Sequence, residues 1–233
     1  DEQLKAVRTV KYQRLGALTL KEEFVMPEDK ELLLTVLLQG IRIEGLGILP
    51  WTNSTRQLKA RLQFIHRIEA SWPDVSENSL LDTLEIWLAP YLYDVKNAQQ
   101  LNKLRLGEII EAMLTWEQKQ ILNEWAPTHL KVPSGRSIAI DYTDPAAPVL
   151  AVKLQEMFGA LDTPVIAGGM VPLTIHLLSP AGRPIQVTKD LASFWSAGYF
   201  AVKKDLKGKY PKHYWPDDPY KAVPTSRVRP REG

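Results

Sequence analysis

Apolar and polar positions follow two different periods along this sequence, and the change between them falls near Pro127. Before Pro127, apolar residues recur at intervals of three and four, which is typical of amphipathic helices. After it, apolar and polar residues alternate, as in residues 138–142 and 173–177, which is typical of strands. The pattern predicts an α+β protein, in which a helical bundle is followed by an antiparallel sheet.

Three domain ranges follow from this pattern. Residues 1–26 alternate loosely around Gly16 and predict either a hairpin or the last strands of an upstream β-domain. Residues 27–127 predict a bundle of four to six helices joined by short loops. Residues 128–233 predict an α+β C-terminal domain with a basic tail.

Helix starts in the bundle are marked by capping residues. Pro27 suits a first helical turn, followed by acidic residues and an apolar stripe that begins at Leu33 and includes Val36. Ser54 and Thr115 each precede a glutamine by three residues, which is the spacing of a capping box. Another amphipathic stretch consists of Leu80, Leu84, Trp87, Leu88 and Tyr91.

The C-terminal domain contains clear turn signals and one clear helix. Residues 133–135, 168–169 and 179–182 separate the alternating runs, and the Gly168-Gly169 pair predicts a hairpin. Residues 150–158 open as a strand and continue as a short helix. Asp190 is a candidate N-cap for a final helix that covers the sheet. The apolar stripe of that helix consists of Leu191, Phe194, Trp195, Gly198, Tyr199, Val202 and Leu206.

Charge is distributed unevenly along the chain, although the net charge is only +2. Residues 183–233 contain 11 Lys and Arg against 5 Asp and Glu, whereas residues 1–182 are slightly acidic. Such asymmetry points to an anionic partner, because phosphate binding needs clustered cations. The candidate nucleic-acid-binding cations are Lys203, Lys204, Lys207, Lys209, Lys212, Arg227, Arg229 and Arg231.

Five of the seven tryptophans fall into two groups. Trp87, Trp116, Trp125 and Trp195 lie on apolar stripes, where core packing is expected. Tyr214 and Trp215 lie among basic residues, and two interpretations of this pair remain open. Either they stack on nucleic-acid bases, or Trp215 holds the tail against the sheet.

Candidate chemistry in the sequence is sparse. A phosphate-binding loop of the GxxxxGK[ST] type is absent from the sequence, as are GxSxG, HExxH and SxxK motifs. The four histidines are scattered, and the chain has no cysteine. The adjacent acids Glu22-Glu23 and Asp217-Asp218 are explained as surface residues. We therefore expect no catalytic residues, no metal and no bound cofactor in this chain. The longest strongly apolar stretch, residues 32–38, is far shorter than the roughly 20 residues of a membrane-spanning helix.

Long blocks of the sequence resemble one family. They include APTHL at 126–130, VPSG at 132–135, LQEMFG at 154–159, VPLTIHLLSPAGRPIQVTKDLASFW at 171–195 and KGKYPKHYWPDDP at 207–219. These blocks are similar to the C-terminal region of the HrpB family of bacterial DExH-box helicases, and shorter matches extend the resemblance over the whole chain. The first residues, which lack a Met and already alternate, read as a fragment of a longer protein.

The resemblance implies a cytoplasmic, ATP-dependent parent helicase that acts on RNA. It implies two RecA-like motor domains in the same polypeptide, which would hold ATP and Mg²⁺ outside this chain. Two roles for the region are open: contact with RNA or other nucleic acid through the basic end, or docking onto the motor or a protein partner. An independent enzyme is the weakest alternative, because the motifs assemble no catalytic site.

Overall fold

The structure is a computed structural model that describes residues 9–25 and 29–230. The chain packs as two compact units. Unit 1 consists of Asp1–Lys59 and Trp72–Thr115, and unit 2 consists of Ala60–Ser71 and Trp116–Gly233. Helix α2 (Asn53–Ile68) contributes residues to both units. Residues 60–71 and 116–127, which the sequence groups with the helical bundle, therefore belong to the unit that contains the large sheet.

The N-terminal hairpin consists of β1 (Thr9–Leu15) and β2 (Leu18–Val25). The strands are antiparallel, with Tyr12 opposite Glu22, and their register shifts between Gln13 and Arg14. The turn requires a left-handed backbone at Gly16, where φ is 57°. The hairpin interpretation is therefore confirmed for residues 9–25, while the remainder of the predicted range lies outside the described residues.

Unit 1 contains more helical segments than the four to six that we predicted for the whole bundle, because short breaks divide the predicted stretches. One such break is Thr83, which separates α3 (Glu77–Asp82) from α4 (Leu84–Trp87). The other segments of unit 1 are α1 (Lys30–Glu44), η1 (Leu46–Ile48), η2 (Ala89–Tyr91), α5 (Ala98–Leu101) and α6 (Leu106–Glu111).

One of the predicted helix starts differs from that in the structure. Asp29 caps α1, accepting hydrogen bonds from the backbone amides of Glu31 and Leu32 at 2.9 and 3.0 Å. At the start of α2 the accepting hydroxyl belongs to Thr52, which takes the Thr55 amide at 3.1 Å. The capping box predicted at Ser54 is therefore wrong by two residues, and Pro27 lies outside the described residues.

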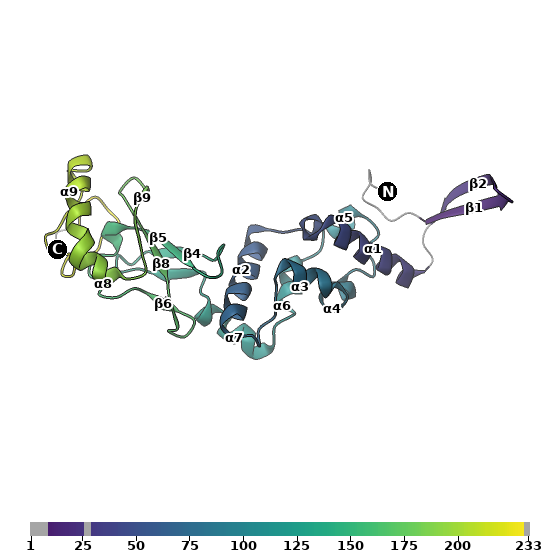
Figure 1. Cartoon of the computed structure of the whole chain (residues 1–233), viewed down its shortest axis with the longest axis horizontal. Helices are drawn as coiled ribbons and strands as arrows, with labels where there is room; N and C mark the ends of the chain where they lie inside the picture. The colour runs from purple at the N-terminus through teal and green to yellow at the C-terminus, as the bar shows by residue number, and fades with distance from the viewer. Residues whose placement is uncertain (1–8, 26–28, 231–233) are drawn as a thin grey trace. The chain divides into compact units, whose positions relative to one another are not determined.

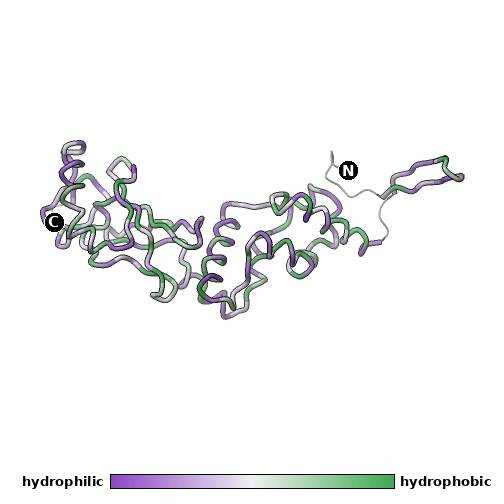
Figure 2. Tube along the Cα trace, in the orientation of Figure 1, coloured by the Kyte–Doolittle hydropathy of each residue, from purple (hydrophilic) through white to green (hydrophobic). Residues whose placement is uncertain are grey.

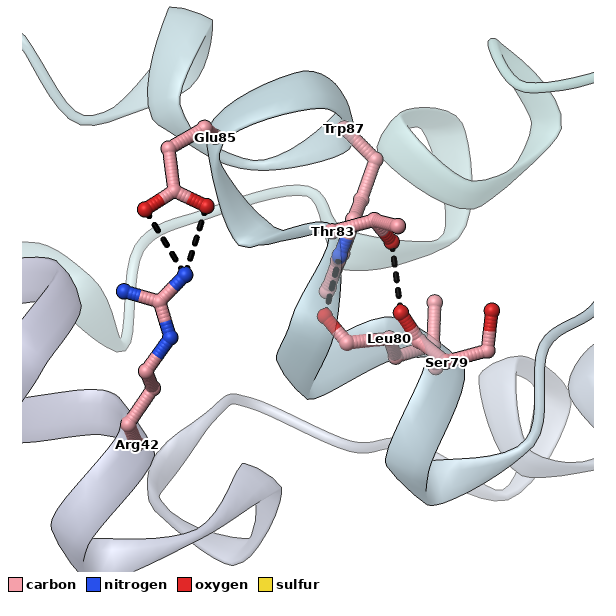
Figure 3. Close-up of polar contacts among 6 residues, drawn as sticks. All are labelled: Arg42, Ser79, Leu80, Thr83, Glu85 and Trp87. Carbon is pink, nitrogen blue, oxygen red and sulfur yellow. Dashed lines mark hydrogen bonds and ion pairs between the residues drawn. The ribbon is translucent and has the colours of Figure 1, made fainter.

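Figure 3 shows separate polar contacts in unit 1, one made by a buried tryptophan and one on the surface. The Trp87 indole N–H donates to the Leu80 carbonyl at 2.9 Å, which holds the buried ring inside its own helical stretch. On the surface, Arg42 Nη2 of α1 donates to both carboxylate oxygens of Glu85 in α4, at 2.7 and 2.6 Å. The Arg42 hydrogen bonds lower the pKa of Glu85. Helix α1 buries Leu33, Leu34, Leu38 and Ile41, whereas Val36 of the predicted stripe is exposed.

Unit 2 is built on a five-stranded sheet in the order β3-β4-β5-β8-β9. Its strands are β3 (His129–Lys131), β4 (Ser137–Asp141), β5 (Val149–Lys153), β8 (Thr174–Leu178) and β9 (Pro184–Thr188). Strands β5 and β8 pair in parallel, with Leu150 opposite Ile175, so the sheet is mixed and the wholly antiparallel prediction is wrong at this pair.

The chain between β5 and β8 explains the parallel pairing, because a parallel pair needs a long crossover connection. This crossover contains η3 (Leu154–Glu156), then β6 (Val165–Ile166) and β7 (Val171–Pro172), which form the predicted Gly168-Gly169 hairpin. Both glycines have the positive φ that this turn requires, 64° and 88°. The predicted passage from strand to short helix at 150–158 is also confirmed.

Helix α7 (Trp116–Trp125) packs in unit 2, and Arg61 of α2 binds its C-terminal end. The Arg61 side chain is buried, and its Nε donates to the Ala126 carbonyl at 2.6 Å. Its Nη2 donates to Asn123 Oδ1 at 2.7 Å. Trp116 at the start of α7 is 71% exposed, so the prediction that it lies in the core is wrong.

The final helical segment lies beside the sheet, as Figure 1 shows. It begins with α8 (Leu191–Ser193), passes through the π-helical turn η4 (Phe194–Gly198) and ends with α9 (Tyr199–Lys209). Asp190 is its N-cap, as predicted, and accepts the Ser193 amide at 2.9 Å. Figure 2 shows mostly hydrophobic strands in the sheet and a mostly hydrophilic C-terminal half of α9. Across the described residues, we find no helix with the length and hydropathy needed to cross a membrane.

Candidate nucleic-acid interface

An aromatic cluster holds α9 against the rest of unit 2. The Phe158 ring lies 5.9 Å from that of Trp195 and 6.0 Å from that of Tyr199, and all three side chains are buried. Tyr199 donates its hydroxyl to the Pro216 carbonyl at 2.8 Å. Burial raises the pKa of Tyr199, and the nearby Tyr214 and Asp217 contribute in the same direction. The buried stripe predicted for this helix is thus confirmed at its aromatic positions.

The lysines predicted to bind nucleic acid are not equivalent. Lys203 is largely enclosed, with 12% of its side chain exposed, and its ammonium group donates to the Pro216 carbonyl at 2.8 Å. It also pairs with Asp217 at 2.5 Å and lowers the pKa of that carboxyl. Lys209 pairs with Asp205 at 2.9 Å on the surface of α9. These two ammonium groups already have anionic partners.

Lys204 and Lys207 are exposed on α9, and within the described residues neither forms a salt bridge. Lys207 follows Lys204 by three residues, so the two side chains lie on the same side of the helix. The charge of Lys207 contributes to lowering the pKa of Asp217, but neither ammonium group is held in an ion pair by a described residue, so both can meet an anion in solution.

The predicted extended tail instead folds back onto unit 2. Its main contact is Gln155 of η3, whose side chain is buried. Gln155 Nε2 donates to the Arg227 carbonyl, and its Oε1 lies 3.1 Å from Nδ1 of His213. The Gln155 carbonyl also accepts the Thr225 amide at 3.0 Å. Residues 210–230 are therefore part of the folded unit.

This return of the tail brings together cations that are far apart in sequence. Arg229 Nε donates to the Lys212 carbonyl at 3.2 Å, and the Tyr214 amide donates to the Val228 carbonyl at 2.9 Å. Lys212, Arg227 and Arg229 are all exposed. Arg231, the remaining candidate, lies outside the described residues. We call the exposed residues Lys204, Lys207, Lys212, Arg227 and Arg229 the basic set.

The two aromatic candidates are occupied by contacts within the unit. The Tyr214 ring packs edge-on against Phe158, with ring centres 5.9 Å apart. The indole N–H of Trp215 donates to the Tyr210 carbonyl at 2.9 Å. Both side chains are half-buried, and these contacts favour the interpretation in which Trp215 holds the tail.

Phe200 is an aromatic side chain that sequence reasoning missed. It is 53% exposed, and it precedes Lys204 by four residues and Lys207 by seven. It was overlooked because it directly follows Tyr199 in an apolar-rich segment. The signal was available, since Phe200 falls off the predicted stripe and on the same helix face as the two lysines.

The described residues contain no cluster of His, Asp and Glu side chains that could hold a metal ion. His213 packs in the tail contact, and its pKa is lowered first by burial and then by the charge of Lys153. What the site offers is therefore positive charge on a rigid surface, with an exposed aromatic ring beside part of it.

Comparison with known families places this arrangement of a helical unit, a small mixed sheet and a basic final helix in the class of helicase C-terminal regions. The chain belongs to the HrpB_C family, described as ATP-dependent helicase C-terminal, which matches residues 87–219. It is 42% identical over 218 residues to the ATP-dependent RNA helicase HrpB of Escherichia coli (strain K12), covering 93% of this chain and 27% of that protein. The resemblance noted in the sequence is thus confirmed.

Two solved structures are similar along most of the chain. The crystal structure of the E. coli DExH-box NTPase HrpB matches with a TM-score of 0.79 and 39% identity, covering 97% of this chain and 30% of that one. The crystal structure of the E. coli DEAH/RHA helicase HrpB matches with a TM-score of 0.67 and 37% identity, covering 91% and 29%. The chain therefore spans less than a third of the length of each relative.

Proposed function

We propose that this region is the part of a cytoplasmic, HrpB-type ATP-dependent RNA helicase that supplies an additional contact with nucleic acid. The observation that carries the proposal is the basic set, whose five side chains are exposed and form no salt bridge within the described residues. Uncompensated cations on one module are the electrostatic footprint of a phosphate-binding surface. Lys203 and Lys209 are left out, because their charges are already paired.

In this proposal the region supplies binding and leaves ATP hydrolysis to motor domains of the same polypeptide. ATP and Mg²⁺ would be held there, and this chain would hold no cofactor. The relative named as an RNA helicase makes RNA the first nucleic acid to test.

A salt series tests the proposal. We expect the 233-residue chain to bind a fluorescent RNA, measured by anisotropy, with an affinity that falls as salt rises. Reversing both Lys204 and Lys207 to Glu should weaken binding for every sequence and reduce the salt slope by about 2, since each phosphate contact contributes about 1. Lys103→Glu, an exposed lysine of unit 1, is the matched control and should leave binding unchanged. An RNA affinity that does not respond to salt would contradict the proposal.

Docking onto the motor or an acidic protein surface is the second candidate. The observation that favours it is that Tyr214 and Trp215, the aromatic residues predicted to stack on bases, are engaged within unit 2. Deleting residues 208–233 from the full-length helicase separates the two functions. Loss of RNA-stimulated ATP hydrolysis with RNA affinity intact would support docking, whereas loss of RNA affinity would support nucleic-acid contact.

A further inference from the structure

One face of α9 combines an exposed aromatic ring with two cations that form no salt bridge within the described part of the chain. Phe200 is 53% exposed, and Lys204 and Lys207 follow it by four and seven residues. Residues at this spacing lie on one side of a helix, with Phe200 and Lys204 about 6 Å apart along its axis. The nearest acid in sequence, Asp205, is five residues from Phe200, points to another side and pairs with Lys209 at 2.9 Å. We call Phe200, Lys204 and Lys207 the outer face of α9.

The position of this face is fixed by the opposite side of the same helix. Tyr199 and Leu206 are buried, and the Tyr199 ring lies 5.6 Å from that of Phe200. The Tyr199 hydroxyl and the Lys203 ammonium group both donate to the Pro216 carbonyl, each at 2.8 Å. These contacts prevent α9 from rotating, so the Phe200 ring is presented to solvent on a rigid element.

Three other exposed aromatic side chains lie beside acidic residues, whereas Tyr12 of the N-terminal hairpin lies under the Arg14 guanidinium, 5.0 Å from its ring centre. Trp116 is followed directly by Glu117, Tyr93 by Asp94, and Tyr220 lies two residues after Asp218. An adjacent carboxylate repels a phosphate, whereas the outer face of α9 attracts one. Exposing a large apolar ring among lysines also costs hydrophobic free energy that burial would recover, which suggests that a ligand covers it.

We propose that the outer face of α9 binds single-stranded nucleic acid, with a base stacked on Phe200 and the neighbouring phosphates bound by Lys204 and Lys207. This inference rests on the proposed function and specifies its substrate. In a duplex the faces of internal bases are stacked on one another, so an aromatic ring gains nothing there. Every base has a π-face, so the site discriminates strandedness rather than sequence.

The test compares three probes of equal length: a single-stranded RNA, the same strand with abasic central positions, and the duplex. Phe200→Leu keeps an apolar side chain but removes the aromatic ring, and Phe200→Tyr keeps the ring. We expect Phe200→Leu to weaken binding of the intact single strand by roughly 5-fold to 100-fold, the range of losses for one stacked base. The abasic strand and the duplex should be affected less than twofold, and Phe200→Tyr should bind like the parent chain.

Trp116→Leu is the matched control, because it removes another exposed aromatic ring of unit 2 and should change none of the three affinities. Circular dichroism checks that each variant retains its helix content. If Phe200→Leu leaves single-strand binding unchanged, or weakens all three probes equally, the stacking role is overturned while the basic set can still bind phosphate. If the parent chain binds no probe at low salt, both the stacking role and the proposed function are overturned.

Discussion

At the scale of single residues, the most unusual environment belongs to Glu156. Its side chain is 1% exposed, and its Oε1 accepts a hydrogen bond from Arg136 Nη1 at 2.9 Å. Its other oxygen, Oε2, is buried without a hydrogen-bond partner among the described residues. The Glu156 carbonyl also accepts the Ser134 amide at 3.1 Å, so this residue fixes the turn between β3 and β4. One exposed arginine therefore compensates a buried carboxylate.

We expect Arg136→Ala to lower the free energy of unfolding by about 2 kcal/mol, because it leaves the buried Glu156 carboxylate unpaired. Urea denaturation followed by circular dichroism measures the change. Adding Glu156→Gln to Arg136→Ala should recover part of the loss, since a neutral amide costs less to bury than a charge. A double variant no more stable than Arg136→Ala alone would show that the pair contributes packing rather than charge compensation.

The sequence could not reveal this environment, because a glutamate in the block LQEMFG reads as an ordinary surface acid. Trp116 illustrates the converse error, in which an aromatic residue on an apolar stripe is assigned to the core although it is exposed. Both errors have the same cause. Burial of a single side chain depends on what packs against it, and periodicity gives only the average for its face.

At the scale of elements, periodicity and capping residues predicted the elements whose form depends on neighbouring residues in the sequence. The final helix, its Asp190 cap and the Gly168-Gly169 hairpin were all predictable, because local geometry dictates them. The parallel pairing of β5 and β8 was not predictable, because it depends on a crossover between segments distant in sequence. Nor did the sequence indicate that α7 packs in the sheet-containing unit, since that depends on Arg61.

The Arg61 contact gives a prediction for this element pair. Arg61→Ala removes donors to the Ala126 carbonyl and to the Asn123 side chain, and it leaves the carbonyl of buried Ala126, directly after α7, without that partner. We expect the free energy of unfolding to fall by about 2–3 kcal/mol. Arg61→Lys should recover only part of this, because an ammonium group cannot reproduce the planar geometry of the guanidinium.

Arg67→Ala is the matched control for Arg61, since Arg67 is an exposed arginine of the same helix. It should alter the unfolding free energy by less than about 0.5 kcal/mol. Equal losses at Arg61 and Arg67 would mean that helix propensity, rather than the contact with α7, accounts for the effect.

At the scale of the whole molecule, one histidine of the tail makes stability depend on pH near neutrality. His213 lies against Gln155, and burial followed by the charge of Lys153 lowers its pKa below the ordinary 6.5. The folded state therefore takes up a proton less readily than the unfolded state. The resulting stability is present above about pH 6.5 and is lost as the pH falls through and below that value.

We expect the urea midpoint of the parent chain to fall between pH 7.5 and pH 5.5, and His213→Gln to fall less over the same interval. The variant removes the proton-binding group while keeping a side chain able to hydrogen-bond Gln155. Identical pH dependence in both proteins would mean that a group other than His213 causes the loss of stability at low pH.

The contacts of Gln155 also constrain when unit 2 can finish folding during synthesis. The groups that satisfy its amide and carbonyl belong to Arg227, His213 and Thr225, all of which leave the ribosome after the strands and helices they close over. Unit 2 therefore cannot reach its final hydrogen bonding while those residues are still inside the exit tunnel, although its sheet can already form. During that interval Phe158 lacks its ring contact with Tyr214, and the Tyr199 hydroxyl lacks its acceptor at Pro216.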